Sequence, residues 1–598
     1  MRAKRKYSQD IRSYWIGSVF ICFMVSTGIS SANQTITDQF PKEKIYVHVN
    51  STTAFVGEYL LYSIYCLDEK TLQPSKLSKI AYVDLISEDG KRVFHHKVRL
   101  KNGRSYADFF IPTDVLSGNY KLIGYTQWMR NFDQSEFFRQ NITIINPYSS
   151  NQNVFLKGVA DSLNQVSIQT ATIPLQEGKP SKFFGDDLTI KLESDRFGVR
   201  EKVSFFLASK TNETDEYNVS ISVRKVPVVP SPKPIPSFSL RDSKLENALN
   251  EGSTVRSYPY LPEIRGELLS GKVLDKETSM PIPEAGVSLS IPEFNSHFKT
   301  AHTNADGSFH FSIQNEYEGE IAAIQILQDM NEAYKLEMLD KEKLATEEVD
   351  FFSFQITQQM EEDILERSFH NQIENAFFSV KPDTVQTVSP KVPFFLDSGL
   401  EYILDDYTRF ATFRETVVEI LEHLWITRES PEKRVFKVRV NPPYTESDKK
   451  PLVLMDGLQV LNHEKLMEYN ARQIEKVSIG RGRYVFGKEV YDGVISIETF
   501  QRDYRPPFDG ISTLGIKLRK PQAPKKYFQQ RYLDNDSDEG KRIPDFRYQL
   551  LWEPKVTMNN SRVFSFFTSD VKGKFELHVE GFSKTGNPIS VRETIMVE

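Results

Sequence analysis

The sequence has 598 residues, of which 39% are hydrophobic and 26% charged. This length exceeds one hydrophobic core and predicts roughly four domains, and the composition is typical of globular rather than disordered chains. Its 75 basic and 81 acidic residues give a formal charge of −6, which argues against nucleic acid as a partner.

Residues 1–32 have the three parts of a secretory signal peptide. Five basic residues precede an apolar stretch at 15–29, which is shorter than a membrane span, and Ser30-Ser31-Ala32 follows with small residues for cleavage. The alternative is an uncleaved anchor. Cleavage would remove five basic groups and one acidic group, so the charge would change from −6 to −10. We expect an exported protein with no transmembrane segment in the mature chain.

Residues 44–148 alternate β-rich runs with turns such as Glu88-Asp89-Gly90 and Lys101-Asn102-Gly103, which predicts a β-sandwich. The stretch resembles the macroglobulin-like sandwich of Bacteroidetes-type envelope proteins. Four segments carry the resemblance: Lys44 to His48, Phe55 to Glu58, Leu116 to Tyr120, and Tyr125 to Phe132.

A second sandwich is expected at 153–226, because Val219 to Val223 and the residues after Asp195 have strand character. Residues 227–264 are expected to form a proline-rich linker. Five prolines fall between Pro227 and Pro236, which favours an extended, semi-rigid segment.

Residues 265–326 predict a third sandwich. Pro283 and Gly286 would shape a bend, Asp306-Gly307 would close a hairpin, and Phe309 and Phe311 would point into the core. The pattern resembles a carboxypeptidase-regulatory-like domain, which implies a scaffold and not a peptidase.

A connecting region at 327–410 contains a predicted helix over 355–378, expected to pack on neighbouring strands. Its apolar residues recur near helical spacing. They are Ile356, Met360, Ile364, Phe369 and Ile373.

Residues 411–503 predict a small α+β domain. A helix at 416–424 precedes a strand at 435–440, and three further strands follow. The order resembles the plug domain of TonB-dependent outer-membrane receptors, carried by Met455-Asp456-Gly457, Ile474 to Val477 and Gly493 to Ile495. Only 98 residues follow Phe500 (598 minus 500), too few for the barrel of about twenty strands that such receptors need. The chain is therefore not expected to be the transporter itself.

Residues 540–598 predict a C-terminal β-sandwich, similar to the closing sandwich of the same macroglobulin-like envelope proteins. The expected fold class is therefore mainly β and multidomain. It comprises several Ig- or macroglobulin-like sandwiches and one small α+β plug-like domain.

The residues suited to catalysis or metal binding form no recognisable motif. His95 and His96 are adjacent and would face opposite sides of a strand, so they cannot share a metal. His297 and His302 would flank a hairpin as surface or core residues. Gly480 and Gly482 are interpreted as turn glycines rather than part of a nucleotide loop.

A weak calcium candidate is formed by Asp534, Asp536 and Asp538, which alternate like the start of a calcium loop. Glu539 occupies the place of the required glycine, so a solvated acidic loop is the favoured interpretation. Cys66 is followed by Leu67-Asp68 and lacks the neighbours of a macroglobulin thioester; we expect a buried thiol. Neither catalytic residues nor a cofactor are expected.

The leading hypothesis is a non-enzymatic scaffold or binding protein in the periplasm or at the outer membrane, acting with an outer-membrane transporter or secretion machinery. The alternative is a surface adhesin or a protease-interacting macroglobulin-like protein. The identity of the partner and the oligomeric state stay open.

Overall fold

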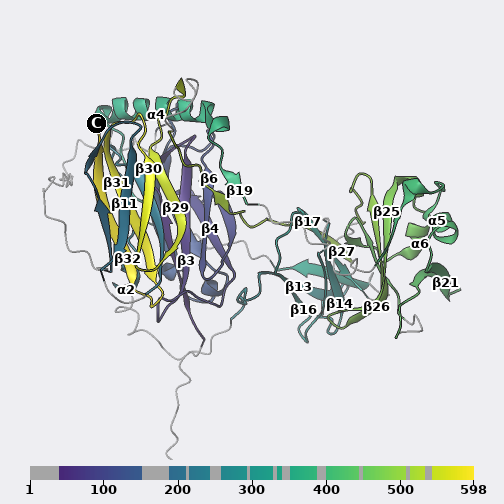
Figure 1. Cartoon of the computed structure of the whole chain (residues 1–598). Helices are drawn as coiled ribbons and strands as arrows, with labels where there is room; N and C mark the ends of the chain where they lie inside the picture. Colours follow the sequence, from purple (N-terminus) through teal and green to yellow (C-terminus); the bar gives the residue numbers. More distant parts are fainter. Residues whose placement is uncertain are drawn as a thin grey trace, which may run out of the picture.

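The computed structural model describes residues 40–150, 152, 187–210, 215–242, 258–292, 297–327, 333–339, 350–386, 399–431, 433–443, 449–506, 512–532 and 542–598. The described residues form a mainly β, multidomain protein, which confirms the expected fold class. Figure 1 shows two neighbouring sandwiches, here called the body, and a separate lobe to one side. The expected signal peptide lies outside the described residues.

The first sandwich packs a three-stranded sheet on a five-stranded one. The order β1-β3-β6 comprises Glu43–Val49, Tyr59–Asp68 and Arg104–Phe110. The order β2-β8-β7-β4-β5 comprises Thr53–Phe55, Phe138–Ile145, Gly118–Tyr125, Ile80–Ser87 and Arg92–Arg99. Short 3-10 helices η1 (Trp128–Asn131) and η2 (Gln134–Glu136) precede β8. The expected turns are present: Gly90 and Gly103 both have positive φ.

The second sandwich combines two distant parts of the chain. One sheet has the order β10-β32-β31-β12-β29, with bounds Arg196–Phe197, Pro588–Val597, Gly573–Ser583, Tyr217–Lys225 and Gln549–Met558. The other has the order β30-β11-β9, with bounds Ser561–Phe567, Lys202–Ser209 and Leu188–Leu192.

This pairing corrects the expectation of separate sandwiches at 153–226 and 540–598. β12 lies between β29 and β31, and β11 lies between β30 and β9, so the two segments share both sheets. The physical reason is that neither segment alone supplies partners for all its strand edges or covers both sheet faces. One hydrophobic core accordingly draws residues from both segments.

The lobe begins with the third sandwich. Its sheets are β16-β13-β18 (Ser308–Ile313, Glu267–Asp275, Tyr334–Met338) and β15-β14-β17-β27 (His297–His302, Gly286–Ile291, Ile321–Ile326, Thr513–Lys517). Phe309 and Phe311 are buried, as predicted, and Gly307 has φ of 73° in the hairpin turn. The sandwich extends past the expected 265–326, because β18 and β27 complete its sheets.

An α+β unit, residues 400–499, is inserted between β18 and β27. Its sheet β20-β25-β26-β23-β24 comprises Leu400–Ile403, Ile474–Phe486, Glu489–Thr499, Leu452–Met455 and Leu458–Gln459. Beside it lie the hairpin β21-β22 (Leu424–Ser430, Lys433–Val438) and helices α5 (Phe413–Glu419), α6 (His463–Met467), η7 (Leu404–Asp406) and η8 (Ala471–Gln473). The helix expected over 416–424 is observed as α5, which begins earlier and ends at Glu419. Leu424 already belongs to β21, after His423 with positive φ.

Helix α4 (Glu361–Ala376), preceded by η4 (Gln358–Met360) and followed by η5 (Phe378–Val380), lies across the top of both body sandwiches (Figure 1). It agrees with the helix expected over 355–378. Phe369 was expected to face inward but is 59% exposed, whereas Arg367 is buried. The inward face of the helix is mixed: Ile364 packs in an apolar cluster with Phe55 and Ile145, and Arg367 binds Glu58 of the first sandwich through two hydrogen bonds of 2.8 Å.

The proline-rich segment is extended, as expected, but its described part is packed between the two body sandwiches. Thr52 donates a hydrogen bond to the carbonyl of Pro232 (2.6 Å), and Tyr46 donates to that of Ile235 (3.1 Å). The amide of Ser237 donates to Glu580 on the second sandwich (2.9 Å). The segment is therefore part of the body interface, and α2 (Ser239–Asp242) follows it.

Buried polar side chains join the facing sheets of the two body sandwiches. His48 of β1 lies 2.6 Å from the hydroxyl of Ser220 on β12, and Tyr65 of β3 donates to the carbonyl of Glu580 on β31 (3.1 Å). The Glu580 carboxylate accepts from His578 at 2.7 Å. Burial opposes ionisation of Glu580, but the His578 hydrogen bond and neighbouring charges hold its pKa at about 2. The body is thus joined by a charged, buried interface.

A small two-stranded sheet ties the connecting segments to the first sandwich. β19 (Thr384–Val385) pairs with β28 (Lys525–Lys526), and Tyr106 donates to the carbonyl of Lys525 at 3.0 Å. The chain therefore returns to the body between the third sandwich and the α+β unit, and again after β27.

Candidate functional site

The sheet of the α+β unit is covered on both faces. One face forms a core with α5 and α6, including Phe413, Val417 and Leu466. The other face contributes Leu452, Leu454 and Val494 to a second cluster that includes Phe298 of β15. A partner protein therefore cannot reach the sheet faces of this unit; the helices, the β21-β22 hairpin and the edges and ends of the sheet stay available.

The seam with the third sandwich combines ring contacts and ion pairs. The Phe298 ring lies 4.9 Å from that of Phe486 and 6.0 Å from that of Tyr491. His302 contacts Glu489 at 3.1 Å, whereas His297 lies at the other end of β15 and contacts the carbonyl of Glu316 at 3.0 Å. The two histidines therefore have separate structural partners.

The turn at Met455-Asp456-Gly457 is held by the Asp456 carboxylate. This carboxylate accepts hydrogen bonds from the amide and hydroxyl of Thr499 (2.7 and 2.6 Å) and from the amide of Tyr504 (3.1 Å). Asp456 and Gly457 have φ of 49° and 82°, a region that favours glycine and that aspartate tolerates. The predicted turn is thus present, and its acid has a structural role.

The end of the lobe farthest from the body carries α5, α6 and β21 (Figure 1). α5 begins with a capping box, in which Thr412 and Glu415 each bind the other's backbone. Two large apolar side chains are solvent-exposed here: Val418 of α5 (70%) and Trp425 of β21 (41%). Exposed tryptophan is enriched at protein interfaces, which makes this end a candidate binding surface.

His463 of α6 lies beneath this surface. Its Nδ1 accepts a hydrogen bond from the amide of Phe436 at 3.2 Å, and burial lowers its pKa to about 4. It is neutral near pH 7 and fixes the β21-β22 hairpin to α6. The sequence contains no local signal for this role, because 27 residues separate the partners.

His95 and His96, on β5, face opposite sides of the strand, as predicted. His95 contacts Asp84 at 2.5 Å, and His96 contacts the hydroxyl of Tyr62 at 2.6 Å. Gly480 and Gly482 do not form a turn: both lie within β25, where its pairing with β26 shifts register. The calcium candidates Asp534, Asp536 and Asp538 lie outside the described residues.

Cys66 is fully buried, as expected, and its Sγ lies 3.5 Å from Glu43 Oε1. Burial and the Glu43 charge raise the pKa of the thiol well above its usual value. Within the described ranges, no three His, Cys, Asp or Glu residues are grouped as metal ligands. Helices in the same ranges all lack the length and apolar character needed to cross a membrane.

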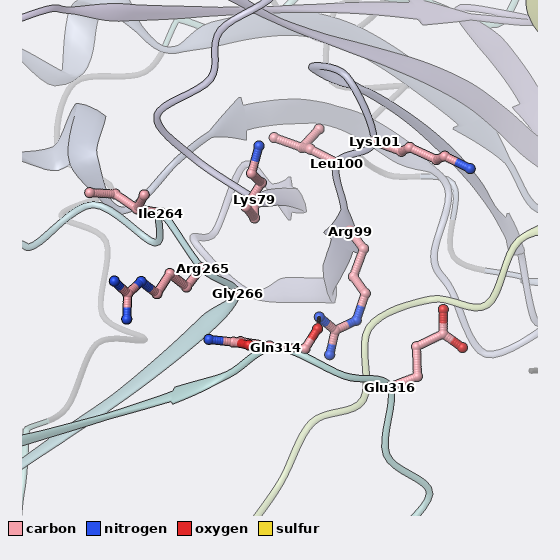
Figure 2. A pocket seen from close by; sticks show the side chains of 9 residues that line it. All are labelled: Lys79, Arg99, Leu100, Lys101, Ile264, Arg265, Gly266, Gln314 and Glu316. Atoms are coloured by element: carbon pink, nitrogen blue, oxygen red, sulfur yellow. Dashed lines mark hydrogen bonds between the residues drawn. The ribbon is translucent and has the colours of Figure 1, made fainter. Parts of the chain in front are cut away.

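A second candidate site is a cleft of about 600 Å³ where the lobe meets the first sandwich. Figure 2 shows Arg99 extending toward Gln314, with Lys79 and Arg265 on one side and Glu316 on the other. Nine residues line the cleft: Lys79, Arg99, Leu100, Lys101, Ile264, Arg265, Gly266, Gln314 and Glu316. Sequence reasoning missed it, since its walls come from four separate stretches of the chain.

Comparisons with known proteins give only distant structural similarity. No protein-family model and no curated protein matches the sequence. Solved structures of alpha-2-macroglobulin from Salmonella (Y1175G mutant) and from Escherichia coli (activated by porcine elastase) each align over 93% of this chain at 8% identity, with TM-scores of 0.22 and 0.23. The chain spans 39% and 44% of those proteins. The Yersinia pseudotuberculosis adhesin InvE aligns over 50% of this chain and 58% of its own, at 10% identity and TM-score 0.13. Such scores carry no functional assignment.

Proposed function

We propose that this protein is a non-enzymatic binding scaffold of the cell envelope, exported to the periplasm or the outer membrane. In this proposal the body holds the lobe so that the α+β unit meets an outer-membrane protein, such as a transporter or a secretion channel.

The observation that carries the proposal is the exposed end of the lobe with Val418 and Trp425. The sheet face that does not contact α5 and α6 packs on Phe298 and its neighbours. The third sandwich therefore holds the α+β unit in place. The resemblance of residues 411–503 to a receptor plug supports an outer-membrane protein as the partner. The signal-like residues 1–32 support export.

An affinity capture from detergent-solubilised envelopes tests this proposal. The full-length protein should capture an outer-membrane protein, and V418E/W425E should lose that capture. L365E/F369E is the matched control, because Leu365 and Phe369 on α4 are an exposed apolar pair (58% and 59%) remote from the lobe end. Equal capture by all three proteins, or recovery of no outer-membrane protein, would contradict the proposal.

The same experiment distinguishes the proposed function from the alternative, a protease-interacting macroglobulin-like protein. Recovery of a protease, unaffected by V418E/W425E, would favour a protease-interacting macroglobulin-like protein. External protease added to intact cells then reports location: protection indicates the periplasm, and rapid cleavage indicates surface exposure.

A further inference from the structure

We propose that the cleft between the first sandwich and the third sandwich binds a small organic anion with at least two negatively charged groups, either phosphates or carboxylates. The inference is independent of the function proposed above. The cleft is positively charged: its lining contains four cationic side chains and one carboxylate, a formal charge of +3, in a chain whose net charge is −6.

The joint between body and lobe is held by other groups. Lys97 of β5 forms a buried ion pair with Glu267 of β13, and Tyr317 donates to the same carboxylate at 2.7 Å. Tyr82 donates to Glu263 at 3.1 Å. Each of these acids is therefore engaged in holding the joint.

The cleft cations have no such partner in the part of the chain that the structure describes. Lys79, Arg99, Lys101 and Arg265 form no ion pair with a described carboxylate. Like charges gathered in one cleft repel each other, and a bound anion would relieve that repulsion.

Arg99 is oriented without being neutralised. Its two terminal nitrogens donate to the carbonyls of Gln314 (3.1 Å) and Asn315 (2.6 Å), which are neutral acceptors. Its buried Nε has no hydrogen-bond partner among the described residues. A guanidinium held in place with its charge uncompensated is suited to attract phosphate or carboxylate.

The shape of the cleft fits a small molecule. Its volume of about 600 Å³ lies within the range of about 300–1,000 Å³ of small-molecule sites. Ile264, which is 51% exposed, offers apolar surface for a carbon frame. Gly266 has φ of 136°, and a Cβ there would lie 2.2 Å from the carbonyl oxygen of Ile313. Only glycine therefore fits at this position of the cleft wall.

Isothermal titration of the full-length protein with inorganic pyrophosphate, with succinate and with uncharged glucose tests the proposal. Pyrophosphate or succinate should bind saturably and glucose should not, and the preferred anion identifies the charged group. K79Q/R265Q should weaken binding roughly tenfold or more, because two charge-assisted contacts are lost. Added salt should weaken binding of the wild type.

K572Q/K584Q is the matched control, since both lysines are exposed on the second sandwich and neither lines the cleft. It should bind like the wild type. If K79Q/R265Q fails to fold by circular dichroism, K101Q, which changes one exposed side chain, replaces it with a smaller expected loss. Absence of saturable binding to both anions, or equal binding by the cleft and control variants, overturns the proposal.

Discussion

Glu58 joins three parts of the body, and its replacement offers a sharp test of how the body is held together. The carboxylate accepts two hydrogen bonds from Arg367 of α4 and one from Arg224 of the second sandwich, all at 2.8 Å. The three side chains are 10%, 8% and 11% exposed, so solvent screens them little. Glu58→Gln keeps the shape and removes the charge.

The size of the effect follows from the Glu58 pKa. Burial opposes ionisation, but the charges of Arg367 and Arg224 outweigh it and hold the pKa at about 2, against an ordinary 4.5. This difference corresponds to about 3 kcal/mol, and removing one partner of a buried pair typically costs about 3–5 kcal/mol. Because the folded-state pKa is the lower one, this stabilisation is complete above about pH 4.5 and is lost as pH falls through about 2.

Hydrogen exchange of the α4 amides measures the loss directly. Glu58→Gln should speed exchange across Glu361–Ala376 by roughly 100-fold at neutral pH, because helix undocking becomes about 3 kcal/mol easier. Glu362→Gln, the same change on the exposed side of α4, should leave exchange within about twofold. If the two variants exchange alike, the ion pairs of Glu58 do not hold the helix and the reasoning is wrong.

Three further predictions concern other buried groups. Glu580→Gln should destabilise the body by about 2–3 kcal/mol above about pH 5, since the Glu580 pKa is held at about 2. Urea denaturation should show the difference from wild type shrinking as pH falls toward 2; a pH-independent difference would contradict this. Cys66 should resist iodoacetamide at about pH 8 in the folded protein and react in guanidinium, because its thiol pKa is raised; rapid modification of the folded protein would refute its burial. Gly493→Ala should destabilise the α+β unit by about 1–3 kcal/mol, because φ is 95° and the new Cβ would meet that of Val438 at 2.6 Å. Limited proteolysis of the lobe should detect this; an unchanged cleavage rate would count against the steric argument.

Turns and the direction of strand side chains were predictable from the sequence, because both depend on residues close together in the chain. The turns at Gly90, Gly103 and Gly307 and the inward side chains of Phe309 and Phe311 follow from turn chemistry and strand alternation. Phe369 was predicted wrongly, because apolar spacing says nothing about a salt bridge on the other side of the helix. The candidate sites depended even less on local pattern: no local signal marks Val418 and Trp425 as exposed, or brings Lys79 and Arg265 together.

The sequence by itself determined the strand-rich, multidomain class, the turns between adjacent strands and the presence of the helix at 355–378. Its patterns act over a few residues, so they show that a strand forms but not which strand lies beside it. Tertiary structure alone decided that β11 and β12 share sheets with β29 to β32, whose nearest paired residues, Arg224 and Gln549, are 325 positions apart (549 minus 224). It also decided that the α+β unit interrupts the third sandwich and that four separated cations line one cleft. A strand edge pairs, and an apolar face packs, with the partner that buries it most completely, and that partner can come from any part of the chain.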